Sequence, residues 1–196
     1  MLAISTGKLK NRVIKTPEIT RPTKSIVKQA VFNIIRSKIG ASGIFIDFFS
    51  GGGNMGIEAV SNNFTAIFIE KFQSAYNILF DNITALSIEF DQYKFSGLKR
   101  INTINNPEKN ILIYGDALKI VKFLNIKFDV AYIDPPYGST LGIKLLSYIE
   151  LLNCAKDNSI VFFETNDEFT NVPQRWKIID KKKYGETFLF QLVKIF

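Results

Sequence analysis

From residue 44 onward, short continuous apolar runs alternate with longer stretches in which apolar residues recur every three or four positions. A short continuous apolar run predicts a strand buried on both faces, and the longer period predicts a helix with one buried side. Strands and helices that alternate along a chain form a parallel sheet covered by helices on both faces. A chain of 196 residues has room for one such domain with a small appendage. The alternation therefore predicts a doubly wound α/β fold.

The pattern predicts five strands with intervening helices, followed by a hairpin. The strands are predicted at 44–47, 65–70, 111–114, 128–133 and 159–163, and the helices at 55–61, 73–86, 117–124 and 141–152. Residues 177–183 and 187–196 flank Tyr184-Gly185-Glu186 and predict an antiparallel hairpin. A mostly parallel sheet that ends in such a hairpin is the strand plan of Rossmann-like methyltransferases, whereas dinucleotide-binding sheets usually continue parallel. The polar residues 87–110 are interpreted as a surface insertion.

The first forty residues differ from the rest of the chain in pattern and in charge. Residues 2–15 predict a short hairpin, and an apolar stripe predicts a helix that starts at Lys24 and ends before Gly40. The stripe consists of Ile26, Val27, Ala30, Val31, Ile34 and Ile35, with Lys28 outside it. Residues 1–40 carry nine Lys and Arg against one Glu, a net +8, while residues 41–196 carry 16 against 17, a net −1.

We therefore divide the chain at the break Gly40-Ala41-Ser42-Gly43 into a basic N-terminal extension, residues 1–40, and a Rossmann-like domain, residues 41–196. A localised basic segment is the electrostatic signature of a phosphate-binding surface. The extension is predicted to bind nucleic acid through the cations of its hairpin, Lys8, Lys10, Arg12 and Lys15.

The chain contains no histidine and a single cysteine, Cys154. This composition excludes Ser-His-Asp hydrolysis, Cys-His proteolysis, His-ligated metal sites and zinc fingers, so no metal is expected. The lone cysteine cannot form an internal disulfide, which predicts a cytoplasmic protein. Apolar stretches stay shorter than ten residues and the first five residues lack signal-peptide architecture, so no membrane association is expected. Catalysis must rest on carboxylates, Lys, Tyr, backbone groups or a cofactor.

A glycine-rich turn, residues 47–56, follows the first of these predicted strands and opens a helix. Gly51, Gly53 and Gly56 fit the Gly-x-Gly-x-x-Gly fingerprint of dinucleotide-binding folds, and Glu70 ends the next strand. Glycines let the backbone approach a ligand closely, and the helix N-terminus offers free N–H groups to an anion. A carboxylate at the end of the second strand can accept hydrogen bonds from both hydroxyls of a ribose. The turn alone is compatible with both NAD and S-adenosylmethionine.

A second motif, Asp134-Pro135-Pro136-Tyr137, ends the fourth strand. Parallel sheets place ligand chemistry at the carboxyl ends of their strands. The two prolines remove N–H donors and leave carbonyls pointing outward, Asp134 adds a carboxylate acceptor, and Tyr137 adds an aromatic face. Hydrogen-bond acceptors beside a stacking ring suit a flipped-out base that is held by its exocyclic amine. By accepting the amine hydrogens, this motif would aim the nitrogen lone pair at a methyl donor, without a general base of high pKa.

The two motifs together resemble the amino-methylating class of S-adenosylmethionine-dependent methyltransferases, and further segments narrow the match. Arg21-Pro22-Thr23, which leads into residues 27–33, is similar to the N-terminal signature of the RsmD family. Residues 49–59 resemble the glycine motif of that family, and residues 115–117 and 184–187 resemble its third-strand segment and terminal hairpin. The resemblance covers nearly the whole chain. The sequence departs from the family pattern at Gly52, at Asn54 and in the longer 87–110 segment.

RsmD enzymes methylate the N2 of a guanine in 16S ribosomal RNA, and the resemblance implies the same activity here. The implied cofactor is S-adenosylmethionine, and the implied partner is 16S ribosomal RNA or the assembled small subunit, with the enzyme a cytoplasmic monomer. The implied cofactor contacts are Asp47, Phe49, Gly51 and Gly53 for the methionine end, Glu70 for the ribose, and Asp116 with Ala117 for the adenine. Those implied for the guanine are Asp134, Pro135, Pro136 and Tyr137, with Arg21 and Thr23 closing the site.

Two other functions remain open on the sequence. A DNA adenine-N6 methyltransferase would also act on an exocyclic amine, but it would need a target-recognition domain for which 196 residues leave little room. A non-catalytic RNA-binding assembly factor could retain the same fold. The intact motif at 134–137 favours an enzyme, because binding alone does not require that geometry.

Overall fold

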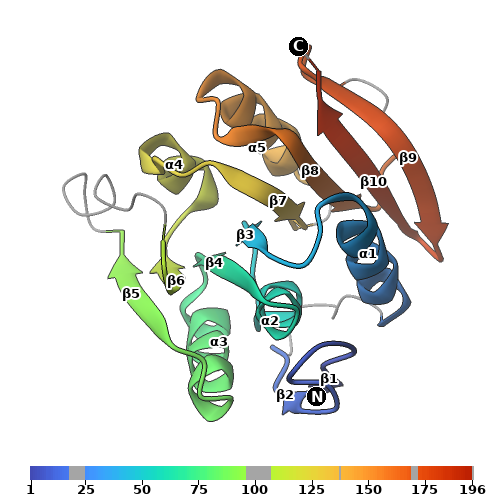
Figure 1. Cartoon of the computed structure of the whole chain (residues 1–196). Coiled ribbons are helices and arrows are strands. Elements are labelled where there is room, and N and C mark those ends of the chain that lie inside the picture. The colour runs from blue at the N-terminus through green and yellow to red at the C-terminus, as the bar shows by residue number, and fades with distance from the viewer. Residues whose placement is uncertain (18–24, 96–106, 137, 169–171, 196) are drawn as a thin grey trace.

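The computed structural model describes residues 1–17, 25–95, 107–136, 138–168 and 172–195. In this part of the chain an eight-stranded sheet has the order β5-β6-β4-β3-β7-β8-β10-β9 (Figure 1). Its strands are β3 (Gly43–Asp47), β4 (Phe64–Glu70), β5 (Phe90–Lys94), β6 (Asn110–Tyr114), β7 (Phe128–Ile133), β8 (Ala155–Thr165), β9 (Trp176–Tyr184) and β10 (Thr187–Lys194). The helices are α1 (Ser25–Lys38), α2 (Asn54–Ser61), α3 (Gln73–Ala85), α4 (Ala117–Ile120) and α5 (Leu141–Leu151). Arg21, Thr23 and Tyr137 lie outside the described residues.

The sheet confirms the predicted mixture of parallel strands and a terminal antiparallel hairpin. The strands from β5 to β8 all pair in parallel. β10 pairs antiparallel with β8 on one side and with β9 on the other. The last strand of the chain therefore lies inside the sheet, between two strands that precede it in sequence (Figure 1).

Helices cover both faces of the sheet, as the continuous apolar strands predict. One face packs against α4 and α5 through residues such as Ile120 and Leu145. The other face packs against α1 and α2 through Val31 and Met55, and against α3 through Leu79. Within the described residues, no helix combines the length and the apolar character that crossing a membrane requires.

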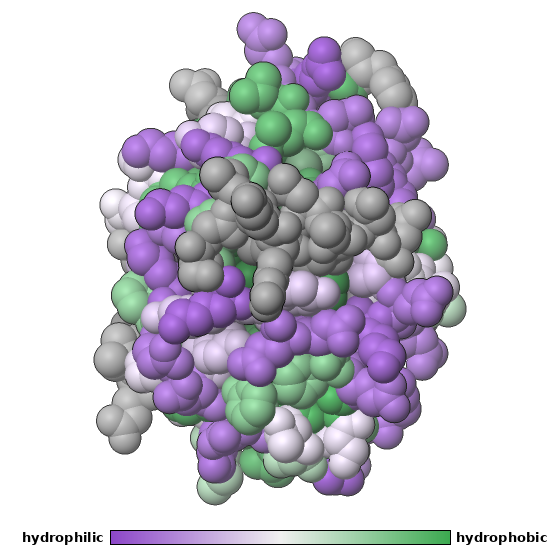
Figure 2. All heavy atoms as spheres, turned by 90° about the vertical axis from the view of Figure 1, so that its left-hand side faces the viewer, coloured by the Kyte–Doolittle hydropathy of each residue, from purple (hydrophilic) through white to green (hydrophobic). Residues whose placement is uncertain are grey.

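Residues 90–94 correct the interpretation of 87–110 as a surface insertion. They form β5, which pairs in parallel with β6 and is the outermost strand on that side. Only Phe90 and Tyr93 of this strand are partly buried. An edge strand has one neighbour and one solvated side, so it lacks the continuous apolar run by which the inner strands are recognised. Figure 2, which views the molecule from this side, shows mostly hydrophilic residues with scattered hydrophobic ones.

The N-terminal hairpin consists of β1 (Leu2–Ala3) and β2 (Val13–Ile14). It confirms the predicted hairpin, with only two residues in each strand. Ile4 and Ile14 are buried against α2 and α3 in one cluster with Ile57 and Leu79. The hairpin therefore shares a core with the helices that flank the glycine turn. The division of the chain at residue 40 stays a prediction about where nucleic acid binds.

Helix α1 confirms the predicted helix and, through Val27, Val31 and Ile35, most of its predicted buried face. Two positions differ from the prediction: Ile26, assigned to the stripe, is 58% exposed, whereas Lys28, placed outside the stripe, is 0% exposed. The buried residues of α1 are Val27, Lys28, Val31, Phe32 and Ile35. Lys28 is tolerated there because its ammonium meets the buried carboxylate of Glu58, with Nζ 3.1 Å from Oε2.

Candidate functional site

A pocket opens at the carboxyl ends of the parallel strands, between the sheet and the N-terminal hairpin. Asp47 and the glycine turn line one side of it, and Tyr132 and Asp134 line another. Lys15 and Pro17 of the N-terminal segment complete the wall. Parallel sheets bind ligands at this end of their strands, so the pocket lies where the fold predicts a site.

The glycine turn is held in a defined shape by its own hydrogen bonds. The Gly53 N–H donates to the Ser50 carbonyl at 2.7 Å, and the Gly56 N–H donates to Asp47 Oδ2 at 3.1 Å. Gly53 has φ +89°, which strains any residue with a Cβ, and an added Cβ would lie 2.4 Å from Leu79. An added Cβ on Gly56 would lie 2.2 Å from the ring of Phe68, so a glycine there lets α2 pack closely on β4.

Glu70, at the end of β4, is tied to the same turn. Its Oε2 accepts from the Gly51 N–H at 2.7 Å, and its Oε1 accepts from the Phe72 N–H at 2.7 Å. Burial raises the pKa of Glu70, and these backbone bonds oppose that rise without cancelling it. Each carboxylate oxygen has a second lone pair, so Glu70 can brace the turn and still accept a ligand hydroxyl.

Asp116 lies at the end of β6, at the start of α4, and is paired with a lysine that the sequence analysis did not single out. Its carboxylate accepts from the Leu118 N–H at 3.0 Å as an N-cap, and it lies 2.9 Å from the ammonium of Lys71. Burial raises the pKa of Asp116, but the hydrogen bond and charge of Lys71 outweigh it and leave a lowered pKa. The Gly115 N–H donates to the Glu70 carbonyl at 2.8 Å, which places the ends of β4 and β6 side by side.

A cluster of acidic groups surrounds Asp134. Loss of hydration raises the pKa of Asp134 well above its usual range, and the charges of Glu164 and then Asp47 raise it further. The pKa of Asp47 rises to about 7, mainly through burial, with a smaller contribution from the charge of Glu70. The Tyr132 hydroxyl donates a hydrogen bond to Glu164. Perturbed carboxylates that gather at a pocket are typical of functional sites.

The structure brings together several of the residues that the sequence singles out. Asp47, Phe49, Gly51 and Asp134 line the pocket. Glu70 contacts the turn beside it, Ala117 is buried at the start of α4, and Gly53 closes the turn. Pro135 is buried, and Pro136 is exposed.

Two acid-cluster members, Tyr132 and Glu164, were not predicted as site residues. Glu164 directly follows the apolar run of β8, as Glu70 directly follows the apolar run of β4. That shared position was the sequence signal that could have identified it. Within the described residues, no group of His, Cys, Asp and Glu side chains is arranged to hold a metal ion.

The predicted nucleic-acid contacts of the hairpin lie on its surface. Lys8, Lys10, Arg12 and Lys15 are all exposed, and Lys15 lines the pocket. Lys15 also lies 3.6 Å from Asp81 in an exposed ion pair, which water and salt weaken. Lys28 is not available to a phosphate, because it is fully buried on Glu58.

Comparisons with known proteins agree with this architecture. The chain is 26% identical over 167 residues to ribosomal RNA small subunit methyltransferase D of Haemophilus influenzae, covering 84% of this chain and 78% of that protein. It is 28% identical over 183 residues to the protein of the same name from Buchnera aphidicola of Acyrthosiphon pisum, covering 91% and 86%. The solved structure of the Escherichia coli protein yhhF superposes with a TM-score of 0.80 at 20% identity, covering 99% and 98%.

The fold is that of the class I methyltransferases, with a mostly parallel sheet and a terminal antiparallel hairpin. A profile of the family described as "Conserved hypothetical protein 95" matches residues 2–193, which is nearly the whole chain. The chain therefore belongs to that family, the RsmD family that its motifs resemble.

Proposed function

We propose that this protein transfers a methyl group from S-adenosylmethionine to the exocyclic N2 of a guanine in 16S ribosomal RNA. The observation that carries the proposal is that Asp134 and the glycine turn line one pocket. The predicted sites for the amine and for the cofactor would thus be next to each other. The names of the relatives support ribosomal RNA of the small subunit as the substrate.

The carboxylates around the turn support S-adenosylmethionine over NAD. Asp47, Glu70 and Asp116 end three neighbouring strands, β3 and β4 directly and β6 one glycine later. Carboxylates attract the cationic groups of S-adenosylmethionine and accept its ribose hydroxyls, whereas they repel the pyrophosphate of NAD. When bound, the cofactor supplies an electrophilic methyl group. Asp47 would hold its methionine end, Glu70 its ribose, and Asp116 with Ala117 its adenine.

Asp134 would act on the base. As a carboxylate it accepts hydrogens of the exocyclic amine and fixes the nitrogen lone pair in the direction of the methyl group. Pro135 and Pro136 would expose carbonyls for the same amine, and Tyr137 would stack on the ring. Arg21 and Thr23 would close the site from the N-terminal side. The enzyme would work as a cytoplasmic monomer on 16S ribosomal RNA or on the assembled small subunit.

The direct test is methyl transfer in vitro. Purified protein is incubated with labelled S-adenosylmethionine and small subunits from a strain that lacks this activity, and the digested RNA is examined by mass spectrometry. We expect label in N2-methylguanosine of 16S ribosomal RNA. In a parallel incubation with DNA in place of the small subunits, label in N6-methyladenine would instead assign a DNA methyltransferase. Tight RNA binding with no methylated nucleoside would assign a non-catalytic assembly factor.

The hairpin cations should account for much of the salt dependence of RNA binding. Replacing Lys8, Lys10, Arg12 and Lys15 with Gln should flatten the slope of log K against log salt by about three units if all four contact phosphates. The measurement is a salt titration of binding to the small subunit, with wild type and variant side by side. A matched control replaces four exposed lysines elsewhere, namely Lys109, Lys119, Lys144 and Lys177. An equal slope for hairpin variant and control would remove the hairpin from the RNA interface.

A further inference from the structure

Three adjacent strands direct acidic groups to the same face of the sheet. Asp47 of β3 is in register with Tyr132 of β7, and Tyr132 is in register with Phe162 of β8. Tyr132 and Phe162 both pack in the cluster beneath α1. Side chains alternate between faces along a strand, so Asp134 and Glu164, each two residues further on, emerge on that same face. Ile133 is opposite Phe163, and Asp134 and Glu164 each follow this pair by one residue. The two carboxyl groups are close enough for the charge of Glu164 to act on Asp134.

Glu164 is buried beside the pocket and is not used by the proposed chemistry. Its residue exposure is 4%, and that of Tyr132 is 1%. The Tyr132 hydroxyl donates its hydrogen to Glu164 Oε2, which requires that oxygen to be an acceptor. A hydrogen bond donated to a carboxylate favours its charged form. Tyr132 thus helps to hold a negative charge next to Asp134.

We propose that Glu164, held by Tyr132, is a positioning residue that sets the pH at which Asp134 becomes able to accept the substrate amine. The inference rests on the proposed function for its catalytic consequence, but its electrostatic part concerns the ligand-free protein alone. A protonated Asp134 donates a hydrogen bond, whereas the reaction needs it to accept one. The charge on Glu164 therefore raises the pH at which Asp134 becomes ionised and thus active.

The proton balance of the reaction shows why this matters. The amine nitrogen forms a bond to the methyl carbon as the carbon–sulfur bond breaks, and the bonding pair stays on sulfur. The nitrogen then carries a positive charge and one proton too many. This proton transfers to an ionised Asp134, and the electrons of the N–H bond return to nitrogen. An acid with a raised pKa is suited to receive that proton and pass it to water. Glu164 would keep the pKa of Asp134 raised in this way.

Removing the charge on Glu164 should move the titration of Asp134 in a defined direction. Glu164→Gln keeps the size of the side chain and an oxygen that can accept from Tyr132. Loss of a neighbouring negative charge lowers the pKa of Asp134, by about one to three units for charges at close range. The midpoint of the acid limb in the pH profile of kcat should move to lower pH by the same amount. Among the described residues, the other ionisable groups facing Asp134 are Asp47 and Tyr132, with Lys15 on the pocket wall.

The primary experiment is a carboxyl ¹³C NMR titration of ligand-free protein labelled at aspartate. The Asp134 resonance is assigned by its loss in Asp134→Asn. We expect its midpoint to drop in Glu164→Gln and to drop by less in Tyr132→Phe. Glu168→Gln, which removes an exposed carboxylate paired with Lys181, serves as the matched control and should leave the midpoint unchanged.

An unchanged Asp134 midpoint in folded Glu164→Gln would overturn the proposal. A drop in kcat at every pH, without movement of the acid limb, would also overturn it, because it would reduce Glu164 to a structural support. If the wild type methylates no RNA, the proposed function fails. The NMR midpoints would still decide whether Glu164 controls Asp134.

Discussion

Asp134→Asn should lower kcat for methyl transfer by at least ~100-fold, the range expected when a positioned acid–base group is lost. The amide has the same size and keeps one acceptor oxygen, but its NH₂ group replaces the second acceptor, and it carries no charge and cannot take up the proton. The loss should appear in kcat, because the interaction matters most as positive charge develops on the nitrogen. Single-turnover transfer of labelled methyl to small subunits measures it.

Cofactor binding separates this effect from a damaged site. Affinity of Asp134→Asn for S-adenosylmethionine, measured by calorimetry, should stay within a few-fold of wild type. Asp47→Asn is the matched comparison, since it changes a carboxylate of the same pocket that lies against the glycine turn and should weaken cofactor binding itself. Near-normal kcat in Asp134→Asn would show that this carboxylate does not act on the amine.

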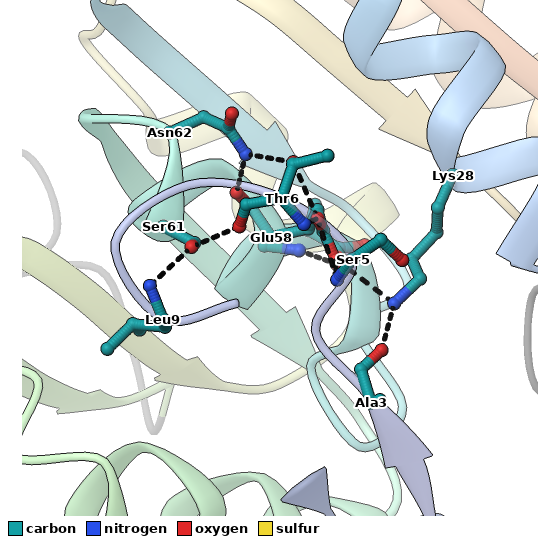
Figure 3. Close-up of polar contacts among 10 residues, drawn as sticks. Ala3, Ser5, Thr6, Leu9, Lys28, Glu58, Ser61 and Asn62 are labelled. Atoms are coloured by element: carbon teal, nitrogen blue, oxygen red, sulfur yellow. Dashed lines mark hydrogen bonds and ion pairs between the residues drawn. The ribbon is translucent and has the colours of Figure 1, made fainter. Parts of the chain in front are cut away.

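The second large effect concerns the buried carboxylate of Glu58, which attaches the N-terminal hairpin and α1 to α2. Glu58 accepts from the Ser5 N–H at 2.9 Å and from the N–H and hydroxyl of Thr6 at 2.6 and 2.7 Å (Figure 3). It also pairs with Lys28, whose ammonium donates to the Ala3 carbonyl at 2.9 Å (Figure 3). Glu58→Ala leaves a buried ammonium and several donors unpaired, so the free energy of unfolding should fall by about 3–5 kcal/mol.

Urea denaturation checks this value, and a double variant tests its origin. The double variant Lys28→Met/Glu58→Gln removes both charges of the ion pair. The amide oxygen of the glutamine can still accept hydrogen bonds from the backbone. This double variant should be more stable than Glu58→Ala, because no charge is left buried without a partner. Equal destabilisation of the two variants would mean that lost packing, rather than the unpaired charge, dominates.

Much of the fold could be predicted because the inner strands are apolar on both faces. Phe128–Ile133 was predicted with its bounds as observed, since all of its residues except the partly exposed Asp129 are buried. β5 could not be found in the same way, because on this edge strand only Phe90 and Tyr93 are even partly buried. Lys28 was misassigned for a related reason, since a lysine on a helix looks solvated until its buried partner is known.

The residues of the site likewise fall into those that the sequence pattern could place and those that it could not. Asp47, Gly51 and Asp134 could be placed together, because each follows or ends a predicted strand and parallel strands bring those ends to one edge. Glu164 and Lys71 act through partners that are distant in sequence, Tyr132 and Asp116. Pairs of this kind arise from strand order and register, and one sequence without its fold does not specify them.

The insertion of β10 between β8 and β9 has a consequence for biosynthesis. A chain emerging from the ribosome can pair β3 with β4 early, but β9 has no neighbour in the sheet until residues 187–194 have also emerged. β8 likewise lacks its neighbour on the outer side until the same segment has emerged, because Leu189 of β10 is opposite Glu164 of β8. Until then β8 presents an unpaired edge, on which another chain could pair. The strand that carries Glu164 would therefore take its final place in the sheet only after residues 187–194 have emerged.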